Sequence, residues 1–161
     1  MRTIWRSPLF AFAACAILTV FCGATFAQDK AADTMQMVRE KVRADKKLLV
    51  AENMQLTETE AAGFWPVYEQ YQQELRILAD RALRMVEHYA ENYESMSEEA
   101  AQKLLDDFMA LEGDRLKIKQ AYRPRFADGL PANKVARYYQ LENKIDAVVN
   151  YALAETIPLV K

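Results

Sequence analysis

The chain has 161 residues, of which 21 are basic and 23 acidic, with one histidine, two cysteines and four glycines. This length predicts one ordinary domain, and the slightly acidic balance argues against a dedicated nucleic-acid-binding protein. A chain of this size buries roughly two thirds of its unfolded surface, so it needs neither a metal nor a disulfide to fold.

Residues 1–27 have the pattern of a secretory signal peptide. Arg2 and Arg6 form a basic start, residues 9–21 are uncharged and almost wholly apolar, and a small-residue cleavage site ends at Ala27. The apolar stretch is too short to cross a hydrocarbon core of about 30 Å. We therefore expect cleavage after Ala27, a periplasmic location and no stable membrane insertion afterwards.

Both cysteines leave with this signal peptide. Residues 28–161 then form a single domain with 19 basic and 23 acidic side chains and a net charge of −4. Without a thiol, this domain has no disulfide, no thiolate nucleophile and no cysteine-ligated metal.

Helix-forming residues dominate residues 28–161, and a long amphipathic helix is predicted over 58–92. Thr57 and Glu60 have the spacing of a capping box at its start, and Pro66 predicts a kink because proline lacks an N–H and clashes with the preceding turn. Nine apolar positions recur at alternating spacings of three and four, which places them on one face: Ala61, Phe64, Tyr68, Tyr71, Leu75, Leu78, Ala82, Met85 and Tyr89.

Three further helices are predicted, over 34–53, 98–122 and 132–156. Ser97, or Ser95 with Glu98, can cap the third helix, and Pro124 disfavours helix beyond Tyr122. The apolar positions of these helices are Met35, Val38, Val42 and Leu49; Ala101, Leu104, Phe108, Leu111, Ile118 and Tyr122; and Val135, Tyr138, Leu141, Ile145, Val148 and Ala152. Because no segment has the period-two pattern of a strand, we expect an all-α fold. It is an antiparallel helical hairpin or bundle, either a closed bundle or an open hairpin that dimerises.

Charge is segregated along the sequence. Residues 58–114 hold 14 acidic and 4 basic side chains, whereas residues 115–137 hold 7 basic side chains and one acidic one. The basic residues are Arg115, Lys117, Lys119, Arg123, Arg125, Lys134 and Arg137. They either form solvated faces that orient helix pairing or a surface for an anionic partner such as lipid headgroups.

Residues for catalysis are scarce. His88 is the one imidazole, which makes a poor zinc site, and the serines of the mature chain, Ser95 and Ser97, look like helix caps. No glycine-rich phosphate loop is present. We therefore predict no enzyme, no metal and no cofactor, with a metal or stress sensor built from carboxylates and His88 as an alternative.

Aromatic residues are the unusual feature of the mature chain. Phe64 and Tyr68 lie on the apolar face of the second helix, whereas Trp65 points off it, and adjacent residues such as Tyr138 and Tyr139 cannot share one face. We predict a protein-binding surface, with the alternative that these rings widen the core. Its residues are Phe64, Trp65, Tyr68, Tyr71, Tyr138 and Tyr139, with Arg123, Arg125 and Arg137 as a basic rim.

The start of the second helix, residues 56–60 (Leu-Thr-Glu-Thr-Glu), resembles the Leu-Thr-x-x-Gln motif of the Spy/CpxP-like small helical periplasmic proteins, with Glu60 in place of glutamine. Residues 96–100 are a looser echo, and residues 130–142 resemble the helix that follows the second motif of that family. The resemblance implies an ATP-independent chaperone or envelope-stress adaptor, often a cradle-shaped dimer.

Together these patterns predict an exported, non-enzymatic protein-binding module. Its expected partners are unfolded or regulatory envelope proteins, with a homodimer as a possibility. The alternative is a structural or scaffold subunit with a closed aromatic core.

Overall fold

A computed structural model describes residues 41–160. The chain divides into two compact units, one ending at Leu48 and one beginning at Leu49. Residues 41–54 are helical, which confirms the described part of the predicted first helix; residues 34–40 of that prediction and the signal peptide lie outside the described residues. Within residues 41–160 the fold is all-α, as predicted, with no strand.

The second unit begins with the last turns of this first helix. Val50 and Met54 are fully buried in its core, and the helix ends at Met54, just before Gln55, whose φ of 47° is left-handed. Leu56 packs against the same core just before the next helix begins.

Helix α2 (Glu58–Asn92) has the predicted bounds and the predicted capping box. The Thr57 hydroxyl accepts a hydrogen bond from the Glu60 backbone N–H, and the Glu60 carboxylate accepts one from the Thr57 N–H at 2.8 Å. Pro66 lies inside α2, which continues across it as helix. The kink predicted there stays a prediction.

Helix α3 (Glu98–Ala127) follows a short 3₁₀ turn, η1 (Tyr93–Ser95). Ser97, not Ser95, is its N-cap, since its hydroxyl accepts from the Ala100 N–H. The predicted end at Tyr122 is wrong, because α3 runs through Pro124 for another turn. That last turn buries Phe126, and the gain from burying a phenylalanine ring offsets the single backbone hydrogen bond that proline removes.

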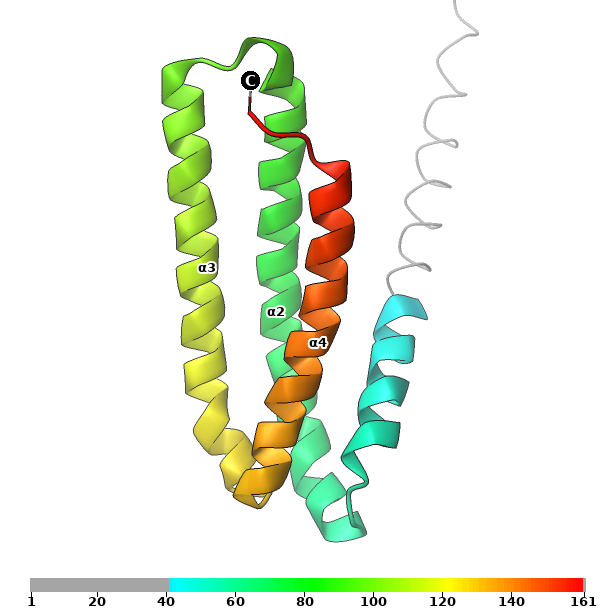
Figure 1. Ribbon diagram of the computed structural model, residues 1–161. Coiled ribbons are helices and arrows are strands. Elements are labelled where there is room, and N and C mark those ends of the chain that lie inside the picture. Colours follow the sequence, from blue (N-terminus) through cyan, green and yellow to red (C-terminus); the bar gives the residue numbers. More distant parts are fainter. Residues whose placement is uncertain (1–40, 161) are drawn as a thin grey trace, which may run out of the picture. The chain divides into compact units, whose positions relative to one another are not determined.

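Helix α4 (Ala132–Thr156) also has the predicted bounds. α3 runs antiparallel to α2, and α4 returns along α2 from the turn at residues 128–131 (Figure 1). A Cβ built on Gly63 would lie 3.6 Å from the Cα of Gly129, so this turn lies against the start of α2. Among the described residues, no helix has a stretch both long and apolar enough to cross a membrane.

Candidate protein-binding surface

In the second unit, the half that contains the start of α2 is filled by a cluster of aromatic rings, here called the aromatic base. Its rings come from all three helices: the centroids of Phe126 and Tyr138 are 4.7 Å apart, and those of Phe64 and Tyr138 are 5.1 Å apart. The six rings at most 3% exposed are Phe64, Tyr68, Tyr71, Tyr122, Phe126 and Tyr138. Because such rings reach across wide gaps, they hold α2, α3 and α4 around one core.

Four residues of the predicted binding surface therefore lie in the core. Phe64, Tyr68, Tyr71 and Tyr138 are at most 1% exposed, so their side chains cannot touch a partner in this fold. The prediction of an open aromatic surface is wrong for these four. The physical reason is that α3 and α4 both pack onto the aromatic face of α2, and each supplies rings of its own.

Trp65 and Tyr139, which point off the main stripe, are half-buried and pack against the same core. The Trp65 ring lies edge-on to Phe64 and Tyr68, with centroids 5.0 and 5.3 Å away. The Tyr139 hydroxyl donates to the backbone carbonyl of Lys119 at 2.9 Å. Both residues widen the core, which is the alternative that the sequence left open.

The three arginines of the predicted basic rim are all exposed, but they do not form one rim. The Arg125 guanidinium donates to the Gln70 side chain and lies 4.5 Å from the centroid of the Tyr122 ring. Arg137 lines a polar groove beside α4. Arg123 is exposed on α3 and lines neither of the two pockets described below.

A small polar network lies inside the aromatic base. The Gln72 amide donates to the Tyr138 hydroxyl at 3.3 Å and to the carboxyl group of Glu142, which is 1% exposed, at 3.1 Å. Burial, with the nearby Glu142 as a smaller cause, raises the pKa values of Tyr71 and Tyr138 well above their usual value. The same causes raise the pKa of Tyr139 to about 12. These hydroxyls stay protonated at neutral pH, and the two hydrogen bonds of Gln72 link α2 to α4.

An ion-pair cluster closes the top of the aromatic base between α3 and α4. Asp146 of α4 lies 3.5 Å from the Lys119 ammonium and 3.9 Å from the Arg115 guanidinium. All three side chains are between 23% and 31% exposed. Arg115, the one charged residue in the apolar stripe of α3, therefore marks the level where the aromatic core ends.

Above this cluster, large apolar side chains of α3 and α4 are exposed, and we call the region of Leu105, Phe108, Val149 and Leu153 the open end. Phe108 precedes Arg115 by two helical turns and Leu153 follows Asp146 by two turns, so in antiparallel helices both lie about 10 Å above the cluster. Both side chains are nevertheless 47% exposed, and Leu105 and Val149, on the same faces, are 49% and 52% exposed. Neighbouring α3 and α4 thus leave four large apolar side chains uncovered.

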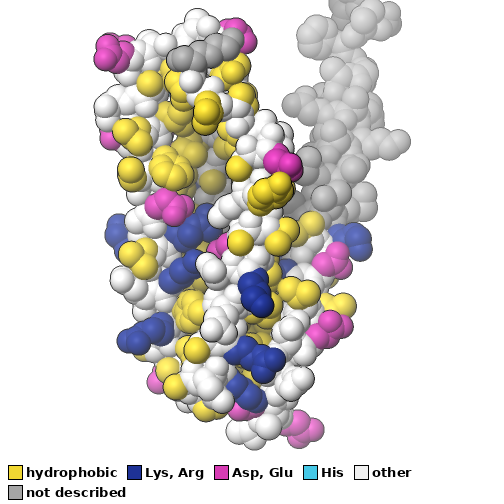
Figure 2. All heavy atoms as spheres, in the orientation of Figure 1, with side chains coloured by type: hydrophobic (Ala, Val, Ile, Leu, Met, Phe, Trp, Pro, Cys, Tyr) yellow, Lys and Arg dark blue, Asp and Glu magenta, His cyan; other side chains and the backbone are white. Residues whose placement is uncertain are grey.

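The space-filling view also distinguishes the open end from the aromatic base (Figure 2). Hydrophobic side chains gather over the upper half of the unit, between α3 and α4, whereas Lys and Arg side chains gather over the lower half (Figure 2). On the α2 side, the Tyr89 hydroxyl donates to the carbonyl oxygen of Pro158 at 2.9 Å and holds the tail that follows α4. An uncovered apolar surface of this kind is typical of a site that binds another molecule.

Sequence reasoning missed the open end because it assigned Phe108 to a core-facing stripe and left Leu105, Val149 and Leu153 outside the predicted stripes. Phe108, Val148 and Ala152 were predicted to face the core, yet all three are exposed. One signal in the sequence points to the end of the core: the charged residue Arg115 occupies a position in the apolar stripe of α3, between Leu111 and Ile118.

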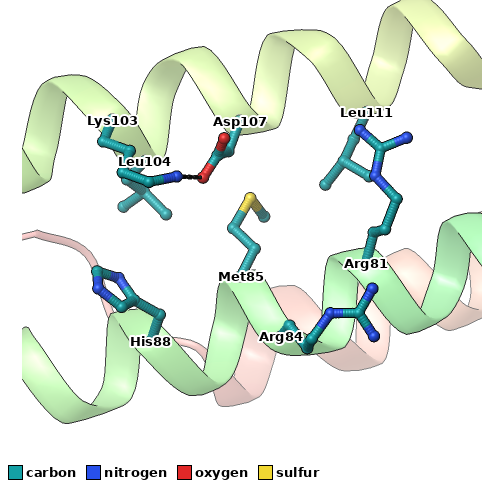
Figure 3. Close-up of a pocket in the computed structure, with 8 residues that line it drawn as sticks. All are labelled: Arg81, Arg84, Met85, His88, Lys103, Leu104, Asp107 and Leu111. Carbon is teal, nitrogen blue, oxygen red and sulfur yellow. Dashed lines mark hydrogen bonds and ion pairs between the residues drawn. The ribbon is translucent and has the colours of Figure 1, made fainter.

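A second pocket lies between α2 and α3 on the side away from α4 (Figure 3). It encloses about 300 Å³, and its lining residues are Arg81, Arg84, Met85, His88, Lys103, Leu104, Asp107 and Leu111. Lys103 pairs with Asp107 inside it, and Arg81 pairs with Asp114 at 2.8 Å. His88 is exposed, and no group of three metal-ligating side chains occurs within residues 41–160. This pocket therefore offers no support for the alternative of a metal sensor.

Comparison with known proteins found no matching family model, no matching curated protein and no matching solved structure.

Proposed function

We propose that this chain is an exported protein-binding module that holds exposed apolar segments of other proteins without ATP, in the manner of a holdase chaperone or an envelope-stress adaptor. One observation carries the proposal: at the open end, Leu105 and Phe108 of α3 and Val149 and Leu153 of α4 are about half exposed on inward-facing stripes. Such side chains cost free energy in water, at roughly 25 cal/mol per Å² of apolar surface. An apolar segment laid between α3 and α4 removes that cost.

Two further features support a binding role. The aromatic base and the Asp146 cluster hold α3 and α4 below the open end, so the binding surface exists before the partner arrives. A preformed surface binds with a smaller loss of conformational entropy. Export to the periplasm rests on the signal-peptide pattern of residues 1–27, and the chaperone class rests on the resemblance of residues 56–60 to the Spy/CpxP-like proteins.

The test is light scattering from a chemically denatured client protein that is diluted into buffer without ATP, with and without the purified chain. We expect the chain to suppress scattering and the double variant Phe108→Ser, Leu153→Ser to lose most of that suppression. The matched control is Ile77→Ser, because Ile77 is 56% exposed on α2 and lies outside the open end. No suppression by the unmodified chain at several-fold excess, or equal loss in the control, contradicts the proposal.

A dye measurement separates this proposal from a scaffold subunit with a closed core. The apolar dye 8-anilinonaphthalene-1-sulfonate should bind the native chain and bind the double variant less, because the variant removes exposed apolar area. The dimer alternative is tested by multi-angle light scattering. A dimer that the double variant converts to a monomer would assign the open end to self-association instead.

A further inference from the structure

A polar groove beside the first half of α4 has a lining that no part of the proposed function uses. It encloses about 460 Å³ and is lined by Asn53, Asn133, Lys134, Arg137, Gln140, Leu141 and Lys144. Three of these side chains are cationic, three are neutral amides and none is a carboxylate. The groove is thus suited to an anion.

Most basic residues of the 115–137 segment already have partners within the protein. Arg115 and Lys119 pair with Asp146, and Lys117 pairs with Asp114 at 2.9 Å. Arg125 bonds to Gln70, and Lys134 pairs with Glu60. Four of the seven basic side chains of this segment are therefore paired with carboxylates.

Arg137, in this segment, and Lys144, further along α4, lack such partners among the described residues. Both are exposed, and neither side chain makes a hydrogen bond or ion pair with another residue in the described part of the chain. They are seven residues apart on α4 and thus lie on the same side of the helix, two turns from each other. Two uncompensated positive charges therefore line the same groove.

The walls of the groove are held in place by contacts at both ends. The Lys134 ammonium donates to the backbone carbonyl of Gln55 at 3.0 Å and pairs with Glu60, whose pKa this contact lowers. Asn53, on the facing wall, donates from its amide to the carbonyl of Leu49 at 2.8 Å. The Asn133 side-chain oxygen accepts from the Lys134 N–H at 2.9 Å, which leaves the Asn133 amide nitrogen as a donor.

We propose that this groove binds a phosphate group, carried by a small organic ester or by a lipid headgroup. A phosphate monoester carries a charge of about −1.5 to −2 near pH 7. It therefore balances two uncompensated cations better than a ligand with a single carboxylate would. The planar fork of Arg137 can donate two parallel hydrogen bonds to phosphate oxygens, while Lys144 acts as a point charge. The volume falls within the range of ligand pockets and exceeds one phosphate, so room for an organic group remains beside Leu141.

The site does not depend on the open end. Its residues come from the first half of α4 and from residue 53, whereas the open end uses the second half of α4 and the first half of α3. A failure of either proposal leaves the other standing.

Calorimetric titration of the full chain with inorganic phosphate, and then with glycerol 3-phosphate, tests the proposal. We expect saturable binding at low salt that the double variant Arg137→Gln, Lys144→Gln weakens at least tenfold, with unchanged helix content by circular dichroism. The matched control is Arg123→Gln, because Arg123 is an exposed arginine of the same segment outside the groove. Binding should weaken at high salt, because exposed charges are screened.

A second arm distinguishes the two sources of phosphate. Sedimentation with vesicles that contain phosphatidic acid, a lipid whose headgroup is a phosphate monoester, should depend on Arg137 and Lys144 if the headgroup is the ligand, and should be absent if the ligand is a free ester. Saturable binding of glycerol 3-phosphate that needs the groove supports the proposal in both cases. The proposal is overturned if neither probe needs the two groove residues, if Arg123→Gln weakens binding equally, or if succinate binds as tightly as phosphate.

Discussion

The aromatic base and the open end are built from the same three helices but differ in what lies across from each residue. Phe126 and Phe108 both lie on the α4-facing side of α3, yet Phe126 is 1% exposed and Phe108 is 47% exposed. Opposite Phe126 stands the ring of Tyr138, 4.7 Å away between centroids. At the open end, Val149 and Leu153 of α4 are themselves about half exposed, and Phe108 stays uncovered. A residue's position on a stripe thus makes it available for burial, and the partner across from it decides whether burial occurs.

The largest expected difference between the two regions is the cost of removing a ring. Phe126→Ala should destabilise the chain by about 3–5 kcal/mol, because it leaves a cavity among packed rings. Phe108→Ala should cost less than about 1 kcal/mol, because its ring is half in water already. Urea unfolding followed by circular dichroism measures both. Equal costs would mean that the open end is closed in solution.

The second largest effect is expected from alkaline pH, which should lower the free energy of unfolding through the tyrosines of the aromatic base. The pKa values of Tyr71 and Tyr138 are raised by burial, so the folded state keeps protons that the unfolded state loses above a pH of about 10. The contribution of these two tyrosines to stability is therefore constant below about pH 10 and falls above it, by up to about 1.4 kcal/mol per pH unit for each tyrosine. Urea midpoints between pH 8 and pH 11 check this loss, and Tyr71→Phe should reduce its steepness. A midpoint independent of pH would show that these hydroxyls are in water.

The boundary between the two regions should respond to the loss of Asp146. Asp146→Ala leaves Arg115 and Lys119 without their shared carboxylate, at a cost of about 1 kcal/mol, because all three side chains are about one quarter exposed and partly screened. High salt should reduce the difference between variant and unmodified chain. Asp106→Ala removes an exposed carboxylate of α3 that lies outside this cluster; it is the matched control and should change the urea midpoint little.

The smallest expected effect is the loss of stability when one ion pair is removed near the open end or at the aromatic base. Lys103 pairs with Asp107 near the open end, and both side chains are about half or more exposed, so Lys103→Ala should cost less than about 0.5 kcal/mol. Lys134, at the aromatic base, pairs with Glu60 and donates to Gln55, and its side chain is only 22% exposed. Lys134→Ala should therefore cost more than Lys103→Ala. The reverse order in urea unfolding would contradict the difference between the two regions.

The helices themselves were largely predictable, because their signals are local. The spacing from Ala61 to Tyr89 and the Thr57–Glu60 capping box defined α2 at both ends. The error at the end of α3 is also instructive. The rule that proline ends a helix is a local one, and it failed because Phe126, beyond Pro124, gains its burial from Phe64, Tyr71 and Tyr138, which are distant in sequence.

The candidate site was not predictable in the same way. Aromatic content directed attention to Phe64, Tyr68, Tyr71 and Tyr138, which the structure buries, and away from Phe108 and Leu153, which it exposes. The groove beside α4 needed the pairing of Lys134 with Glu60 and the absence of such a partner for Arg137 among the described residues. Neither follows from spacing along one helix.

The sequence by itself determined an all-α chain with helices over 58–92 and 132–156, because caps, propensity and apolar spacing act within a few residues of each other. Only the tertiary structure decided that the rings of the aromatic base form the core and that Leu105, Phe108, Val149 and Leu153 remain exposed. The physical reason is that burial is a property of two facing surfaces: the rings of three helices fill the base completely, whereas above Asp146 the side chains of α3 and α4 do not cover one another.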